Sequence, residues 1–174
     1  MKLLKFLPNR VWRVYRGGAC LDRLRGIANP ADGSFPEEWI ASTVAAQNPQ
    51  RDSPGEGISR VLLPDGSAER FDRVLEREAE TLLGPDHPAS AGRTPGFLTK
   101  LLDSAIRLPV QAHPDREASR RLFRSPYGKT EAWIVLEGRR INGEEPYLLM
   151  GFNDRFDFEV FRREALAGVM EKTL

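Results

Sequence analysis

The sequence predicts an α+β fold with a mainly β centre between two helices. Three patterns support this prediction: helical apolar spacing over about residues 68–83, the same spacing over about 158–174, and alternating apolar and polar residues between them. Thirteen prolines and fifteen glycines divide the chain into short elements. With 174 residues the chain has the length of one domain, so we expect residues 1–174 to share a single core.

Both helices are predicted from apolar residues that recur every three or four positions. In the first helix these are Phe71, Val74, Leu75, Ala79 and Leu82. Gly84 follows, as is typical just after the end of a helix. In the second helix the apolar residues are Phe158, Phe161, Ala165, Leu166 and Val169. Asp157 precedes them and is the expected N-cap.

Three segments of the centre are predicted to be strands. Over residues 106–113, apolar Ile, Leu, Val and Ala alternate with Arg, Pro, Gln and His, which is the pattern of a half-buried strand. Two apolar segments follow at 131–137 (EAWIVLE) and 146–152 (PYLLMGF), with Asn142-Gly143 as the turn region between them. A short helical segment is expected at about 117–123.

Composition excludes several classes of function. The 26 basic and 25 acidic residues give a net charge of +1, which does not favour capture of nucleic acid or of an anionic membrane. The single cysteine, Cys20, favours a reducing compartment. No apolar stretch approaches the roughly 20 residues that cross a bilayer, and Lys5 interrupts the apolar start MKLLKFL. We therefore expect a soluble cytoplasmic protein with no nucleic-acid or membrane partner.

Gln111 and His113 are the first candidate functional residues. On a strand, residues two apart point to the same face, so the two side chains project together, opposite the apolar face. An amide oxygen beside an imidazole nitrogen forms half of a plausible metal site, and Glu131 on the next strand would add an anionic ligand. The alternative is a surface role, with His113 at a strand end and Lys129 with Glu131 as a surface ion pair.

Motifs in the same part of the chain resemble a known family. Lys100–Asp103 (KLLD), Gln111–Asp115 (QAHPD) and Gly128–Glu131 (GKTE) follow the order of these motifs in type I phosphomannose isomerases. The resemblance extends over roughly residues 10–155. It implies the cupin β-barrel as the fold and the interconversion of mannose 6-phosphate and fructose 6-phosphate as the activity.

Two further segments are similar to the family. FPEEWIAST resembles its Glu-x-Trp-x-x-Ser segment, which falls on Glu37 or Glu38, Trp39 and Ser42. GEGISRV resembles the glycine-rich stretch that follows it.

The resemblance implies a metal site and an active-site lysine. The family's metal, usually zinc, is held by the glutamine and histidine of one motif, the glutamate of the next and a further histidine; the first three fall on Gln111, His113 and Glu131. The family's active-site lysine falls on Lys129. From its place on the strand face of Gln111 and His113, Arg107 is our candidate contact for the substrate phosphate, with a solvated surface charge as the alternative.

The sequence departs from the family at two points. Trp12 is separated from Gly17-Gly18, whereas the family often has a compact Trp-Gly-Gly. The family's fourth ligand lies in a later Pro-x-Gly-x-x-His turn that does not occur before Leu174, and the other histidine, His87, lies in a loop rich in proline and glycine, where we expect a surface role. We therefore expect an incomplete cupin-like barrel whose unpaired strand edges permit self-association.

Three functions are compatible with these observations. The first is a zinc-dependent isomerase acting on a hexose 6-phosphate through an enediol. The second is a non-catalytic metal- or sugar-binding cupin module. The third is an N-terminal piece that works only when joined to a complementary polypeptide.

Overall fold

The computed structural model describes residues 3–87, 92–152 and 156–167. Its helices and antiparallel sheets make the chain α+β, as the sequence predicted. The chain divides into two compact units, Met1–Ala112 and His113–Leu174. Among the described helices, none is long and apolar enough to cross a membrane.

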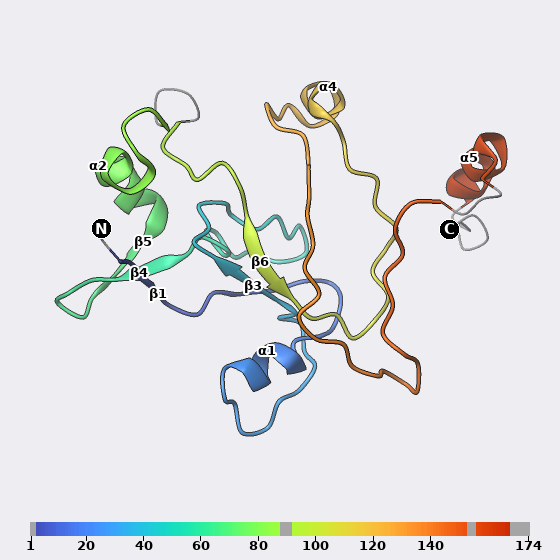
Figure 1. The fold of residues 1–174 in the computed structure, drawn as a ribbon, viewed down its shortest axis with the longest axis horizontal. Coiled ribbons are helices and arrows are strands. Elements are labelled where there is room, and N and C mark those ends of the chain that lie inside the picture. Colours follow the sequence, from blue (N-terminus) through green and yellow to red (C-terminus); the bar gives the residue numbers. More distant parts are fainter. Residues whose placement is uncertain (1–2, 88–91, 153–155, 168–174) are drawn as a thin grey trace. The chain divides into compact units, whose positions relative to one another are not determined.

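The first unit contains two antiparallel sheets of three strands. One sheet, in the order β1–β4–β5, consists of β1 (Lys5–Phe6), β4 (Arg60–Leu62) and β5 (Ala68–Arg70). The other, in the order β2–β3–β6, consists of β2 (Arg10–Val11), β3 (Glu37–Ile40) and β6 (Thr99–Leu102). β3 and β6 lie side by side, with Trp39 opposite Lys100 (Figure 1). Neither sheet closes into a barrel within the described residues.

Helix α2 (Phe71–Leu83) provides much of the core of this unit. The buried cluster consists of Val61, Phe71, Val74 and Leu75. The ring of Phe6 meets that of Phe71 edge-on, with 4.9 Å between centroids. The helix ends at Gly84, which has a φ of 93° and whose N–H donates to the carbonyl oxygen of Glu80. The predicted C-terminal glycine is confirmed.

The predicted start of this helix at Ala68 is wrong. Ala68–Arg70 form β5 and pair with β4 instead of forming the first helical turn. The N–H of Phe71 then donates to the carbonyl oxygen of Ser59 at 2.8 Å. Because strand pairing satisfies these backbone groups, the helix begins at Phe71, where the first buried side chain of its apolar stripe lies.

Helix α1 (Ala19–Leu24) follows a glycine pair that passes beside the end of β6. A Cβ atom on Gly17 would lie 1.9 Å from the carbonyl oxygen of Asp103, so no other residue fits this position without a backbone shift. Oδ2 of Asp103 accepts the N–H groups of Gly18 at 3.1 Å and Cys20 at 2.7 Å. The glycine pair is thereby tied to the last residue of the Lys-Leu-Leu-Asp motif.

The second unit begins with a short helical segment that confirms the prediction for about 117–123. Helix α4 (Arg116–Ala118) continues directly into the π-helical turn η1 (Ser119–Phe123). Oδ1 of Asp115 caps the segment by accepting the N–H of Ala118 at 2.8 Å.

Helix α5 (Phe158–Ala167) confirms the second predicted helix as far as the structure describes it; its predicted remainder, residues 168–174, lies outside the described residues. The expected N-cap is present, because Oδ1 of Asp157 accepts the N–H of Val160 at 2.9 Å. The helix packs through Phe161, whose ring lies 5.2 Å from that of Phe152 and 5.7 Å from that of Phe156.

The predicted strand over 106–113 is wrong in the described structure, where this segment is extended but belongs to no sheet. Pro109 has no N–H to donate to a neighbouring strand, which weakens any ladder at this point. The apolar face expected to be buried is open, since Ile106 and Val110 are exposed. Alternation of residue types therefore did not produce a paired strand here.

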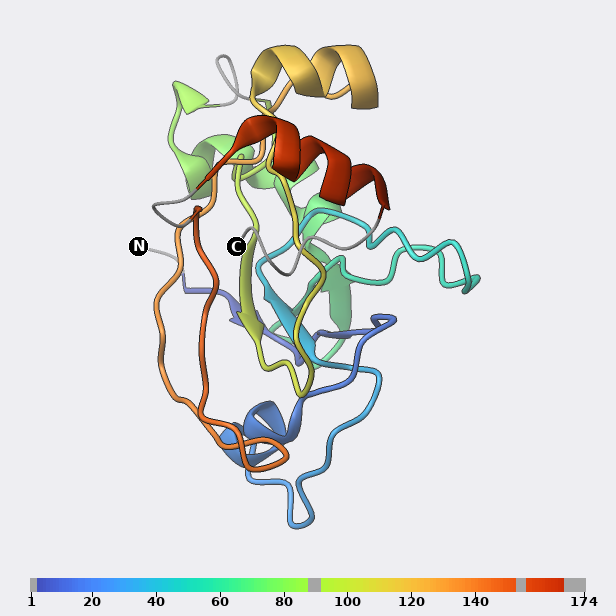
Figure 2. The ribbon, with the colours of Figure 1, turned by 90° about the vertical axis from the view of Figure 1, so that its right-hand side faces the viewer.

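The segments 131–137 and 146–152 also form no ladder in the described structure (Figure 2). Of the described residues from 131 to 152, only Ile141 and Glu144 pair, and they close the predicted turn. Asn142 and Gly143 have φ values of 52° and 85°, as a type I′ turn requires. Pro146 then interrupts pairing because it lacks an N–H, so the arms leave the turn without a shared sheet.

Candidate functional site

The turn after His113 meets the Gly-Lys-Thr-Glu segment in the second unit through backbone contacts. The N–H of Lys129 donates to the carbonyl oxygen of Pro114 at 2.9 Å. A Cβ atom on Gly128 would lie 3.0 Å from that oxygen and 3.1 Å from the nitrogen of Arg116, so glycine permits the close approach. The capping bond of Asp115 holds the turn against which Gly128 packs.

These backbone contacts bring three of the predicted site residues together around one carboxylate. Nε2 of His113 lies 2.7 Å from Oε2 of Glu131. Nζ of Lys129 lies 3.2 Å from the other oxygen, Oε1. The indole Nε1 of Trp133 donates to Oε2 at 3.2 Å. Glu131 is therefore the centre of the cluster.

The cluster keeps Glu131 ionised. Partial burial acts to raise the pKa of this carboxyl, but hydrogen bonds from His113, Trp133 and Lys129 outweigh burial and lower the pKa to about 2. The Glu131 and His113 side chains remain 24% and 31% exposed, so a ligand can reach both. A permanently charged, accessible carboxylate beside an imidazole is suited to a cation or to a polar substrate.

The pair of His113 and Glu131 fits a divalent metal by its chemistry. Imidazole nitrogen and carboxylate oxygen are both ligands that zinc uses in proteins. The imidazole would have to exchange its hydrogen bond with Glu131 for the metal, which requires the proton to reside on Nδ1. Among the described residues, no group of three or more His, Cys, Asp or Glu side chains gathers as a metal site. The predicted ligand set contains only two residues of these types, His113 and Glu131, because its third ligand is the glutamine Gln111.

Gln111 and Arg107 belong to the first unit, whereas His113, Lys129 and Glu131 belong to the second. Both Gln111 and Arg107 are exposed and both have interactions of their own. The joining of Gln111 to the metal pair and the contact of Arg107 with phosphate therefore stay predictions.

His87 has a local partner in the first unit. Its Nε2 lies 2.7 Å from the carbonyl oxygen of Thr94, within the same turn-rich region. This contact accounts for the half-buried histidine by loop structure, and the surface role expected from the sequence stays a prediction.

A second charged cluster surrounds Glu37 in the first unit. The sequence motifs named Glu37 or Glu38, Trp39 and Lys100, but they did not predict that these residues form a cluster. Glu37 is 3% exposed and accepts hydrogen bonds from the hydroxyl of Tyr15 and, at 2.7 Å, from Nε1 of Trp39. Arg13 and Lys100 approach the carboxylate to 3.1 and 3.5 Å. Burial opposes ionisation, but these partners outweigh it and lower the pKa of Glu37, while burial and the carboxylate raise the pKa of Tyr15.

The Glu37 cluster joins two motif segments. Glu37 and Trp39 lie on β3, and Lys100 lies opposite Trp39 on β6. Glu37 and Trp39 share a face, because residues two apart on a strand point to the same side. Glu38 is also buried and instead pairs with the guanidinium of Arg25. The alternation Glu-x-Trp was the signal that could have found this cluster from the sequence.

No protein-family model, no curated protein and no solved structure matches the chain. The likeness to phosphomannose isomerases therefore rests on the sequence motifs.

Proposed function

We propose that the chain is a metal-dependent aldose–ketose isomerase of the phosphomannose isomerase type, which interconverts mannose 6-phosphate and fructose 6-phosphate. The observation that supports this most is the meeting of His113 and Lys129 at the carboxylate of Glu131. These residues come from two motifs eighteen positions apart, and a surface role for each would not require them to meet. We extend the proposal to a cupin-like barrel and to a cytoplasmic location, the latter supported by the lone Cys20.

The reaction requires a proton to move between C2 and C1 of the sugar through an enediol. A base must remove the proton, and the carbonyl oxygen must be stabilised as it gains negative charge. Zinc held by His113, Glu131 and Gln111 would supply electrophilic stabilisation of that oxygen, worth several kcal/mol. Glu131 carries the negative charge that such a site requires, because its pKa of about 2 keeps it ionised.

Lys129 is the residue that would act on the substrate. Its ammonium group is held at 3.2 Å from Glu131 and its side chain is 47% exposed, so it can turn from the carboxylate toward a bound sugar. Two roles are open to it: donation of a hydrogen bond to the developing oxyanion, or transfer of the proton between C2 and C1. A positioned acid or base of this kind contributes typically about 10²–10⁴-fold to the rate.

A non-catalytic metal- or sugar-binding module is the second candidate. The contact of His87 with Thr94 favours this candidate. The isomerase family uses a second histidine as a metal ligand, whereas the second histidine of this sequence contacts its own loop. Such a module would bind zinc or sugar through the His113–Glu131 pair without turnover.

A coupled assay for fructose 6-phosphate formation from mannose 6-phosphate separates these candidates. The 174-residue protein is stripped with a chelator, assayed, and assayed again after zinc is restored. We expect zinc to restore turnover, and Glu131→Gln to abolish it. Glu144→Gln is the matched control, since Glu144 is an exposed carboxylate of the same unit. A folded protein that binds zinc with no turnover would contradict the isomerase and support the module.

A further inference from the structure

The helical segment beside the candidate site carries an unusual group of arginines. They are Arg116, Arg120, Arg121 and Arg124, and all are exposed. In the part of the chain that the structure describes, the side chain of none of them forms a hydrogen bond or an ion pair. From Asp115 to Lys129 the chain contains five basic residues and two acidic ones, so the segment is locally cationic.

Arginines of the first unit are used differently. Those that form ion pairs with carboxylates include Arg10, Arg13, Arg25, Arg51, Arg70, Arg73 and Arg77. In the cationic segment, the carboxylate of Asp115 is already engaged by the N–H of Ala118 as a helix cap. Glu117 is the other acidic side chain, and no ion pair joins it to these arginines among the described residues. The guanidinium groups of the segment therefore have donors available for a ligand.

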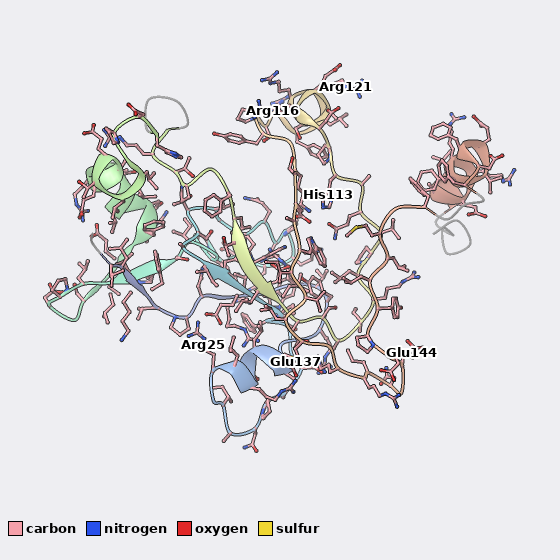
Figure 3. The ribbon with its side chains drawn as sticks, viewed as in Figure 1. Arg25, His113, Arg116, Arg121, Glu137 and Glu144 are labelled. Atoms are coloured by element: carbon pink, nitrogen blue, oxygen red, sulfur yellow. The ribbon has the colours of Figure 1, made fainter. Side chains whose placement is uncertain are left out.

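Two of these arginines share a face of the helical segment. Arg120 follows Arg116 by four positions, close to one turn of this α-to-π segment, whereas Arg121 lies about a quarter of a turn further round. Figure 3 shows Arg116 and Arg121 on this segment, above His113 in that view. Like charges four residues apart on a helix repel each other. An anion bound between the two guanidinium groups would be attracted to both and would offset that repulsion.

Arg116 is also adjacent to the candidate site. Its backbone nitrogen lies beside Gly128, where an added Cβ would come within 3.1 Å, and Lys129 is the next residue. The backbone contact of Lys129 with Pro114 holds this arrangement. The backbone of Arg116 is thus close to the chain that carries Lys129.

We propose that Arg116 and Arg120 bind a phosphate group, and that its source is the phosphate of the sugar held at the His113–Glu131 pair. A planar guanidinium presents two parallel N–H donors, which suits phosphate oxygens. Phosphate binding itself follows from the arginines alone, whereas the sugar-phosphate part rests on the proposed function. Arg116 and Arg120 are thus candidate phosphate contacts in addition to Arg107, which the sequence predicted.

Calorimetric titration of the chelator-treated 174-residue protein tests this inference. The probes are inorganic phosphate, mannose 6-phosphate and mannose, at low ionic strength. We expect both phosphates to bind and mannose not to bind. Arg116→Gln and Arg120→Gln should each weaken phosphate binding by about tenfold or more. Arg121→Gln is the matched control, because it removes the same charge from another face, and it should change affinity by less than about twofold.

Three outcomes would overturn the inference, and one would uphold it while contradicting the isomerase. Equal losses in all three variants would mean that general charge attracts phosphate, and binding of single-stranded RNA in preference to both phosphates would assign the arginines to nucleic acid. Phosphate binding that depends on Arg116 but without turnover in the zinc-restored assay would uphold the anion site and contradict the isomerase. Turnover with an unchanged KM for mannose 6-phosphate in Arg116→Gln would uphold the isomerase and contradict the anion site.

Discussion

Nε2 of His113 lies 2.7 Å from Oε2 of Glu131, although eighteen residues separate them in the chain. The contact depends on Gly128, which lets the chain before Glu131 pack on the turn after His113. An ion that replaces the shared hydrogen bond would find one nitrogen and one carboxylate oxygen already close together. The pair would therefore form half of the metal site that we propose.

Glu131→Gln is expected to lower zinc affinity by at least about a hundredfold. Loss of a residue that only hydrogen-bonds to a metal ligand lowers metal affinity by about 10–100-fold, and this substitution removes an anionic ligand itself. Competition with a chromophoric chelator measures the affinity. Glu144→Gln should leave it unchanged, because Glu144 lies exposed beside the turn at Asn142-Gly143. Equal affinities in all three proteins would show that Glu131 holds no metal.

Lys129→Met is expected to lower kcat by about 10²–10⁴-fold while zinc affinity stays within a few-fold of the original. The reason is that Lys129 contacts Glu131 from the opposite oxygen to His113 and is not itself a ligand. Steady-state kinetics with a parallel zinc titration separates the two effects. Thr130→Ala, at the neighbouring exposed position, is the control. A parallel loss of zinc affinity would make Lys129 a positioning residue for the carboxylate.

Gly17→Ala is expected to destabilise the protein by about 1–3 kcal/mol, the usual range for overpacking, or by more if the backbone cannot move. Its Cβ would lie 1.9 Å from the carbonyl oxygen of Asp103. Gly33 offers a matched control, because it pairs with Gly17 through the same backbone bonds and an added Cβ would meet nothing within 4 Å. Urea unfolding measures both variants. Similar stabilities for Gly17→Ala and Gly33→Ala would contradict the predicted clash.

Glu37 is expected to make stability depend on pH. Its pKa is lowered in the folded state, so its contribution is present above the ordinary glutamate pKa and is lost as the pH falls through the lower folded value. The free energy of unfolding should therefore decrease as the pH falls below about 4.3, the ordinary glutamate pKa. Glu37→Gln should cost about 1–3 kcal/mol at pH 7 and flatten this dependence.

Urea unfolding at a series of pH values checks the dependence on Glu37. Glu76→Gln serves as the comparison, since Glu76 forms an exposed pair with Arg73 and such pairs contribute little. If the two variants show the same pH profile, the buried cluster does not contribute in this way.

The apolar arms 131–137 and 146–152 are expected to promote self-association. Ile134 and Met150 are 86% and 85% exposed, and neither arm belongs to a sheet among the described residues. Exposed apolar chain with unused backbone donors favours pairing with another copy. Sedimentation velocity should show association that rises with concentration and decreases in Ile134→Lys or Met150→Lys. Leu24→Lys, at an exposed position of α1, should have no such effect, and association unaltered by the arm substitutions would exclude the arms.

Local patterns predicted the elements whose determinants lie within a few residues. Apolar spacing identified α2 and α5, Asp157 and Gly84 marked helix ends, and Asn142-Gly143 marked a turn. Capping bonds and positive φ angles are determined by a few neighbouring residues, so they can be predicted from the local sequence. The motifs likewise predicted that His113, Lys129 and Glu131 lie together, and the three side chains meet at one carboxylate.

Strand pairing and the contacts of the charged side chains were decided only by tertiary structure. Alternation predicted a strand at 106–113, and apolar segments predicted strands at 131–137 and 146–152. The ladders instead lie earlier in the chain, at β3 with β6 and at β4 with β5. A strand exists only if another segment supplies its hydrogen bonds, and that partner is remote in the sequence. For the same reason the sequence could name His113 and Glu131 only as candidates. Packing at Gly128 brings Nε2 of His113 to 2.7 Å from Oε2 of Glu131. Likewise, the burial of Glu37 among its cationic partners depends on the fold.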